Sequence, residues 1–218
     1  MRRENETYLF TVEGETEGWY FRWLQDAIHS SAALRTAKLD CNKKDPVKMS
    51  KSLSVLEKTE VIHVIDRESE DTIHVQRFQF ALNRMKEAQK NGKVKYRLGY
   101  SNFAFELWMI LHKADCNGPL HHRSDYLPLL NSAYSEQFES LDKYKKEDNF
   151  KRILSKLTLD DVGQAIRRSK GIMRRNEENG CTLHEYKGHK YYKENPALSI
   201  GEVIEKILVE CGLSQYKT

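Results

Sequence analysis

The stretch Val61-Ile62-His63-Val64-Ile65-Asp66-Arg67-Glu68 decides the fold of this chain. Its first five residues are mostly β-branched and apolar, a pattern typical of a parallel strand that is buried on both faces. The charged residues that follow end the strand and lie where the chain leaves the sheet. Such a strand needs strands beside it and helices above and below it. The flanking sequence should therefore supply both.

Segments of strand and helix character alternate on both sides of this strand. Further strands are predicted at 7–12, 37–40 and 94–100, where β-branched and aromatic residues gather. Helices are predicted at 16–28, 46–58, 73–90 and 103–112, where apolar residues recur at helical spacing. Strands that alternate with helices are typical of parallel sheets. The sequence therefore predicts an α/β fold with a parallel sheet and flanking helices.

The strand signals fade beyond about residue 116, and helical periodicity takes over. Helices are predicted at 124–133, 143–157, 159–175 and 200–211. No Gly/Ser-rich linker separates this part from the sheet, so the later helices should pack onto it. We expect an α/β domain over residues 1–115, followed by a helical, basic region over residues 116–218.

The composition is that of a globular protein. Of the 218 residues, 39% are hydrophobic and 31% are charged, and the longest apolar run, 104–111, contains Glu106, so no membrane-spanning helix is expected. The first residues lack the apolar segment of a secretory signal, so we expect a cytoplasmic protein. The four cysteines form no CxxC pair, which argues against a disulfide framework and against a zinc site.

Basic residues are concentrated in the second half of the chain. The net charge is only +4, but residues 141–195 carry fourteen basic against nine acidic side chains. Such a surface would attract a polyanion such as nucleic acid. Solvated basic helices are common, however, and explain the same charge equally well.

Acidic residues follow three of the predicted strands. Glu13 comes after the first strand, Asp66 and Glu68 end the central one, and Glu106 lies in the helix after the fourth. Because ligands of open parallel sheets bind beyond the carboxyl ends of the strands, these side chains are candidates for one site. Carboxylates that lie together repel one another unless a cation is present, and an all-oxygen donor set suits Mg²⁺ or Mn²⁺. The neighbouring acids expected to cap helices or face solvent are Glu15, Glu17, Glu70 and Asp71.

Several blocks of the sequence resemble the RloB-like (AbiLii-type) proteins. They are Glu13-Gly14-Glu15-Thr16-Glu17 with Tyr20-Phe21, Asp66-Arg67-Glu68, and Ser101-Asn102-Phe103-Ala104-Phe105-Glu106-Leu107-Trp108 with Leu111-His112. The similarity extends to Ala165, to Lys170 and to Asn195-Pro196-Ala197-Leu198-Ser199, so it covers nearly the whole chain. The Ser-Asn-x-x-Phe-Glu-Leu-Trp block is its most specific part.

The resemblance implies a Toprim domain, a Rossmannoid parallel sheet that cleaves nucleic acid with Mg²⁺. It also implies a place in bacterial phage-defence and restriction-associated loci, often beside an ABC/AAA-type ATPase. The Toprim glutamate would correspond to Glu13 and the DxD pair to Asp66 and Glu68. This sequence has a glutamate in place of the second aspartate, and Phe103 in place of the usual proline after Ser-Asn. Because Mg²⁺ tolerates little misplacement of its ligands, these departures put activity in doubt more than fold.

The main hypothesis is a metal-dependent nuclease that acts on DNA or on structured RNA such as tRNA. Glu13, Asp66 and Glu68 would hold one or two Mg²⁺ or Mn²⁺ ions, and Glu106 would orient a water or act as general base. The basic helical region would bind the phosphate backbone. Candidates for stabilising charge on the phosphate are Arg67, Arg168 and Lys170.

The alternative hypothesis comes from another class of protein. The chain would then be a non-catalytic nucleic-acid-binding or effector subunit that works through an ATPase partner. An Asp66→Ala variant separates the two, because an enzyme loses its activity whereas a binding subunit loses little.

Overall fold

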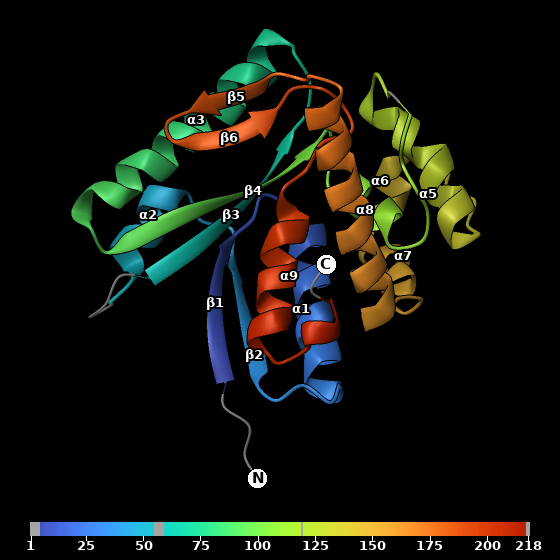
Figure 1. The fold of residues 1–218 in the computed structure, drawn as a ribbon, viewed down its shortest axis with the longest axis horizontal. Coiled ribbons are helices and arrows are strands. Elements are labelled where there is room, and N and C mark those ends of the chain that lie inside the picture. The colour runs from blue at the N-terminus through green and yellow to red at the C-terminus, as the bar shows by residue number, and fades with distance from the viewer. Residues whose placement is uncertain (1–4, 55–58, 119, 217–218) are drawn as a thin grey trace.

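A four-stranded parallel sheet forms the centre of the molecule (Figure 1). The computed structural model describes residues 5–54, 59–118 and 120–216. The strands are β1 (Asn5–Thr11), β2 (Thr36–Asn42), β3 (Thr59–Arg67) and β4 (Val94–Asn102), in the order β2-β1-β3-β4. The apolar run that begins at Val61 lies in β3, between β1 and β4, and is buried. The predicted parallel α/β fold is therefore confirmed.

Helices cover both faces of the sheet. Those of the first half are α1 (Glu15–Ser30), α2 (Pro46–Ser52), α3 (Thr72–Ala88) and α4 (Glu106–Leu111). The apolar residues of α1, α4 and the later helices form one core, and those of α3 form a second core against β3 and β4. The helix predicted at 46–58 begins at Pro46 as expected but ends at Ser52, and residues 55–58 lie outside the described part.

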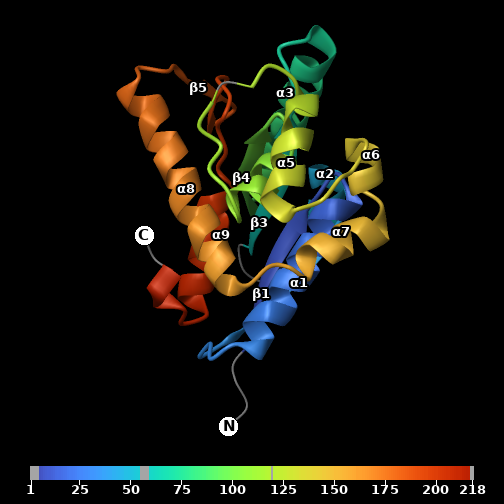
Figure 2. The ribbon, with the colours of Figure 1, turned by 90° about the vertical axis from the view of Figure 1, so that its right-hand side faces the viewer.

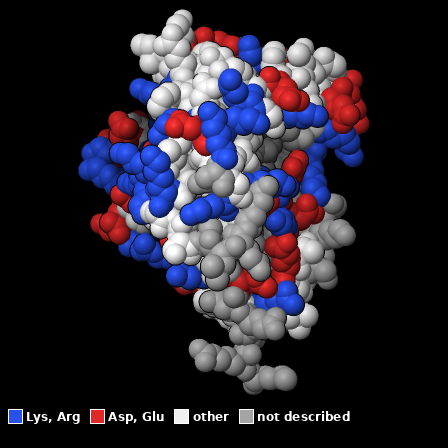
Figure 3. All heavy atoms as spheres, turned by 90° about the vertical axis from the view of Figure 1, so that its left-hand side faces the viewer, with Lys and Arg blue, Asp and Glu red and all other residues white. Residues whose placement is uncertain are grey.

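Lys and Arg side chains are spread over the face on which α2 and α3 lie (Figure 3).

The second half is mainly helical, as predicted. Its elements are α5 (Tyr126–Tyr134), α6 (Leu141–Tyr144), α7 (Glu147–Leu154), α8 (Leu159–Glu178), β5 (Leu183–Tyr186), β6 (His189–Tyr192) and α9 (Ile200–Glu210), with short 3-10 turns at Gln89–Asn91, Arg123–Asp125 and Ser214–Tyr216. The predicted helix at 143–157 is divided into α6 and α7, because Lys146 is extended (φ −64°, ψ 139°).

A β-hairpin that the sequence analysis missed joins α8 to the last helix. Its strands β5 and β6 are antiparallel and are connected by Lys187 and Gly188, which both have positive φ, 54° and 85°. The sequences Asn-Gly and Asp-Gly usually indicate a two-residue turn of this kind. Lys187-Gly188 adopts a turn with positive φ at both residues but has neither sequence, so the hairpin was not predicted.

The helices of the second half pack directly on the sheet domain. One continuous core contains Trp108 from α4, Tyr126 from α5, Ile166 from α8 and Ile204 from α9. Figure 2 looks onto α5, α6 and α7, and α7 lies beside α1, with the Phe150 ring centroid 5.9 Å from that of Trp19. Among the described residues, no helix has the length and hydrophobicity needed to cross a membrane.

Two buried histidines make the stability of this fold depend on pH. The His63 Nδ1 atom lies 2.8 Å from the Thr11 hydroxyl, and the His112 Nε2 atom lies 3.1 Å from the Tyr20 hydroxyl. Burial lowers the pKa of both imidazoles to about 4. An unfolded histidine titrates near pH ~6.5, so the unfolded chain takes up protons that the folded protein excludes. Their contribution to stability is therefore complete above pH ~6.5 and is lost as the pH falls toward 4.

We expect the free energy of unfolding to fall between pH ~6.5 and ~4, by about 3 kcal/mol for each buried histidine. Glu13, whose pKa is raised, contributes the opposite slope. Urea unfolding of the wild type is therefore compared with that of His112→Gln, which leaves Glu13 in place. The variant should lose stability less steeply as the pH falls. Identical pH profiles would contradict this account.

Candidate functional site

Four carboxylates come together beyond the carboxyl ends of β1 and β3. Glu13 follows β1, Glu17 lies in the first turn of α1, Asp66 is near the end of β3, and Glu106 is the first residue of α4. The Glu13 carboxylate accepts a hydrogen bond from the backbone N–H of Asp66. The charges of Glu17, Glu106 and Glu13 all act on the Asp66 carboxyl. We call these four residues the acidic cluster.

Three members of the acidic cluster, Asp66, Glu17 and Glu13, hold protons more tightly than ordinary carboxyls do. Burial is the largest cause for all three affected groups, and the neighbouring carboxylates add to it. The pKa of Asp66 is raised well above its usual range, that of Glu17 is raised, and that of Glu13 is raised to about 7. A bound cation would relieve this repulsion and release the protons.

Lys145 contributes a positive charge to the acidic cluster. Its Nζ atom lies 3.0 Å from Oε1 of Glu106, a carboxylate that is only 1% exposed. Burial tends to lower the pKa of Lys145, but the carboxylates of Glu106 and Asp66 outweigh it and raise the pKa. The second oxygen of Glu106, Oε2, is buried and has no hydrogen-bond partner within the described part of the chain. The site therefore contains one carboxylate oxygen that is free to accept a ligand.

Glu17 is the member of the cluster that the sequence analysis misplaced. It was expected to cap α1 or face solvent, but it is buried, and its Oε2 accepts a hydrogen bond of 3.1 Å from the Thr16 hydroxyl. The side chain folds back over Gly14, where an added Cβ would lie 2.5 Å from Oε2. A glycine before the helix therefore gives room for a carboxylate that turns toward Asp66 rather than toward solvent.

Glu68 lies at the edge of the acidic cluster and is surrounded by basic side chains. Its carboxylate oxygens lie 3.3 Å from Arg77 Nη1, 3.4 Å from His74 Nε2 and 3.9 Å from Arg123 Nη1. Its charge contributes to the raised pKa of Glu13. Of the three predicted metal ligands, the structure thus brings Glu13 and Asp66 together and engages Glu68 with basic side chains.

The family model for RloB-like proteins matches residues 8–207. This chain belongs to the RloB-like family. A search of curated proteins and a search of solved structures gave no match. Nearly all of the fold described above, from β1 to α9, thus lies within the part that defines an RloB-like protein.

The Ser-Asn-x-x-Phe-Glu-Leu-Trp block of this RloB-like chain joins the site to the C-terminal segment. The Asn102 side-chain amide lies within hydrogen-bond distance of the carbonyls of Tyr192, Lys193 and Glu194, at 3.2, 3.2 and 2.8 Å. Four residues later, Glu106 enters the acidic cluster. The same block therefore fixes a distant segment of backbone and supplies a carboxylate to the site.

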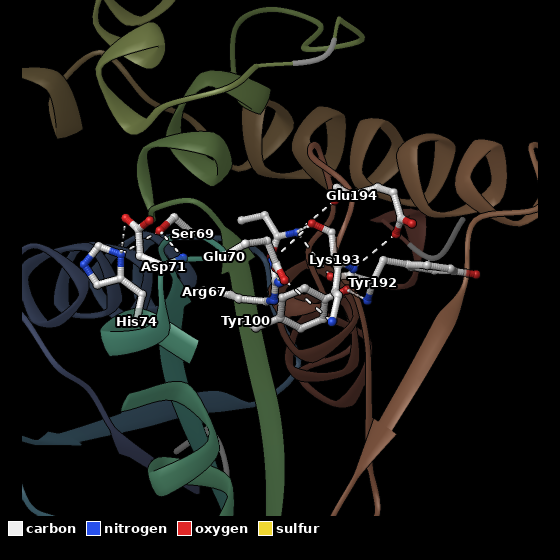
Figure 4. Close-up of polar contacts among 10 residues, drawn as sticks. Arg67, Ser69, Glu70, Asp71, His74, Tyr100, Tyr192, Lys193 and Glu194 are labelled. Carbon is white, nitrogen blue, oxygen red and sulfur yellow. Dashed lines mark hydrogen bonds and ion pairs between the residues drawn. The ribbon is translucent and has the colours of Figure 1, made fainter. Parts of the chain in front are cut away.

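Arg67 is part of this connection and does not face the acidic cluster. Figure 4 shows its side chain directed toward Tyr192 and Lys193, away from Ser69 and His74. Its Nη1 donates a hydrogen bond of 3.0 Å to the Lys193 carbonyl, its guanidinium lies over the Tyr191 ring, and it pairs with Glu70. Arg67 is 3% exposed. The structure therefore gives no support to a role of Arg67 in stabilising charge on a phosphate, because its guanidinium is buried and engaged within the protein.

Lys170 and Arg168 are also engaged elsewhere. Lys170 Nζ lies 2.7 Å from Glu205 of α9, and Arg168 Nη1 donates a 2.7 Å hydrogen bond to the Leu111 carbonyl. Neither has a contact with the acidic cluster among the interactions of the described residues. The cations that do lie near these acids are Lys145, beside Glu106, and Arg123, beside Glu68. Both are far from their partners in the sequence, so no short motif predicts the contacts.

The donor set fits a hard divalent cation better than it fits zinc. Over residues 5–54, 59–118 and 120–216, no three His, Cys, Asp or Glu side chains stand in the arrangement of a metal-ligand set. The chemistry of the cluster nevertheless suits Mg²⁺ or Mn²⁺, because it offers oxygen atoms only, one of them buried without a partner, and its carboxylates raise one another's pKa. The residues that would hold such an ion are Glu13 and Asp66, with Glu17 and Glu106 beside them.

Proposed function

We propose that this RloB-like protein is a metal-dependent nuclease that hydrolyses phosphodiester bonds of nucleic acid. The observation that carries the proposal is the acidic cluster, in which Asp66 is surrounded by Glu13, Glu17 and Glu106 at the carboxyl edge of a parallel sheet. Such a concentration of carboxylates costs free energy in the folded protein. It is therefore expected at a site that binds a cation.

The side chains around the cluster suit a phosphate substrate. A divalent ion bound by Glu13 and Asp66 would polarise a phosphate oxygen and lower the pKa of a bound water. Lys145 holds the Glu106 carboxylate in place, and Glu106 Oε2 is available to accept a proton or orient a water. Arg77 and Arg123 bring positive charge to the edge of the cluster, where the phosphate of an incoming strand would lie.

The biological setting of the proposal rests on the family. The Toprim domain that the resemblance to RloB-like proteins implies supports a bacterial, cytoplasmic enzyme of anti-phage defence that acts with an ABC/AAA-type ATPase. The substrate is DNA or a structured RNA such as tRNA. The predicted role of the basic C-terminal helices in backbone binding has less support, because several of their cations pair within the protein, as Arg152 and Lys156 do with Glu136.

The test of the proposed function is cleavage by the purified protein. Labelled single-stranded DNA, plasmid and total tRNA are incubated with Mg²⁺, with Mn²⁺ or with EDTA. We expect cleavage that requires metal and that is lost in Glu13→Gln, since this change keeps the size of the side chain and removes its charge. Asp71→Asn serves as the matched control, because Asp71 is exposed and outside the cluster. Cleavage in EDTA, or full activity of Glu13→Gln, would contradict the proposal.

One observation favours the non-catalytic alternative. Lys145 already supplies a cation to Glu106 and Asp66, and Arg77 and Arg123 already neutralise Glu68. A cluster neutralised by lysine and arginine has less need of a metal. If neither Mg²⁺ nor Mn²⁺ binds by calorimetry and no substrate is cleaved, the chain acts as a binding or effector subunit.

A further inference from the structure

Helix α3 carries a surface with two exposed apolar side chains. Ile73 is 67% exposed and Phe80 is 62% exposed, although residues of this kind are usually buried. They are seven residues apart and therefore lie on the same side of the helix, with Arg77 between them. The Arg84 guanidinium lies over the Phe80 ring, 6.0 Å from its centroid, and the ring is otherwise exposed. Helix α3 itself lies on the side of the molecule that Figure 3 shows.

A hollow separates Phe80 from the acidic cluster. It has a volume of about 310 Å³, and its walls include Phe80, Arg77 and Arg84 from α3, together with Lys43 and Glu13. Pockets of about 300 Å³ are at the small end of those that hold organic ligands. Because Glu13 belongs to both the hollow and the acidic cluster, a chain bound in the hollow would continue directly into the proposed catalytic site.

The charges around the hollow favour an anion. Arg84 uses its guanidinium on Asp45, at 2.7 and 2.8 Å, which neutralises that carboxylate. Lys43, Lys44 and Arg77 remain at the surface, with solvent-exposed contacts to Glu15, Ser52 and Glu68. Ion pairs of this kind contribute little and exchange readily for a phosphate. The hollow thus combines an exposed aromatic ring with exposed cations, which is the combination found in proteins that bind single-stranded nucleic acid.

We propose that α3 binds an unpaired nucleotide of the substrate, with its base stacked on Phe80 and its phosphates held by Arg77, Lys43 and Lys44. The inference rests on the proposed function, since the unpaired nucleotide belongs to the nucleic acid that the proposed nuclease site would cleave. A single-stranded segment fits better than a duplex, because the faces of paired bases are already covered by their neighbours in the stack. The exposed ring needs a free base to stack on.

The test measures binding in EDTA, so that it does not depend on catalysis. Fluorescence anisotropy follows labelled oligo(dT), oligo(rU) and a DNA duplex of the same length, with the wild type, Phe80→Ala and Phe80→Trp. We expect Phe80→Ala to weaken binding of the single strands by about 5- to 100-fold and Phe80→Trp to retain it. Leu183→Ala is the matched control, because Leu183 is also exposed and lies on the hairpin. Duplex binding should be weaker and unchanged in all variants.

The possible outcomes separate this inference from the proposed function. Single strands that bind the wild type and Phe80→Ala equally would overturn the inference, even if the protein cleaves nucleic acid. Binding that depends on Phe80 without any cleavage would support the inference and contradict the proposed nuclease activity. If Phe80→Ala changes the molecular mass in light scattering but not the affinity for oligonucleotides, α3 is a protein contact and the inference is wrong.

Discussion

Replacing Asp66 with asparagine should abolish metal-dependent cleavage and at the same time stabilise the metal-free protein at neutral pH. Asp66 is partly buried, and its pKa is raised by that burial and by the charges of Glu17, Glu106 and Glu13. Asparagine has nearly the same shape and no charge, so it removes the repulsion. Losing a metal ligand should lower the cleavage rate by about a hundredfold or more, since losing even a supporting residue around a metal costs about 10- to 100-fold.

The pH dependence of this stabilisation has a definite sign. A carboxyl whose folded pKa is raised contributes stability below its unfolded pKa, near ~4, and that contribution is lost as the pH rises through the folded pKa. The Tm of Asp66→Asn should therefore match that of the wild type in acid and exceed it near neutrality.

Thermal unfolding in EDTA and in Mg²⁺ measures both effects together. Mg²⁺ should raise the Tm of the wild type, because the ion binds only the folded site, and should not raise that of Asp66→Asn. Asp71→Asn removes the same charge from an exposed position in the next loop and should behave like the wild type. An Asp66→Asn protein that melts lower than the wild type in EDTA would contradict the charge repulsion at Asp66. One that still responds to Mg²⁺ would show that the cluster does not bind a metal through Asp66.

The fold was predictable because its signals are local and strong. The apolar run in β3 and the alternation of strands with helices specify a parallel sheet, and the position of Asp66 at a strand end then places it at the ligand-binding edge. Glu13 and Glu106 follow from the same rule. For this reason, three of the four members of the acidic cluster were candidates before any coordinates were known.

The remaining parts of the site depend on contacts between distant segments. Lys145 reaches Glu106 because the helix is interrupted between α6 and α7. The sequence Lys145-Lys146-Glu147 contains no Gly or Pro and therefore predicts a continuous helix. Lys170 lies on a basic helix, but its ammonium pairs with Glu205 of α9. Which cation enters the cluster is decided by packing, and composition gives no information about it.

Replacing Lys145 with methionine should cause the largest loss of stability among these variants. It leaves the Glu106 carboxylate buried, with Oε1 deprived of its 3.0 Å partner and Oε2 already without one. Removing one partner of a buried ion pair typically costs about 3–5 kcal/mol. Lys143→Met is the matched control, because Lys143 lies two residues earlier in the chain, in α6, and is exposed.

The double variant Glu106→Gln/Lys145→Met shows whether the loss comes from this pair. It should recover much of the stability, since neither charge remains. The response to Mg²⁺ then decides what the ammonium does. If lysine and metal share the same carboxylates, Mg²⁺ should raise the Tm of Lys145→Met more than that of the wild type, because the ion replaces the missing charge. Equal shifts would mean that Lys145 holds Glu106 without competing with the ion. A loss of stability with no response to Mg²⁺ in either protein would favour the non-catalytic subunit, in which lysine is the permanent cation of the acidic cluster.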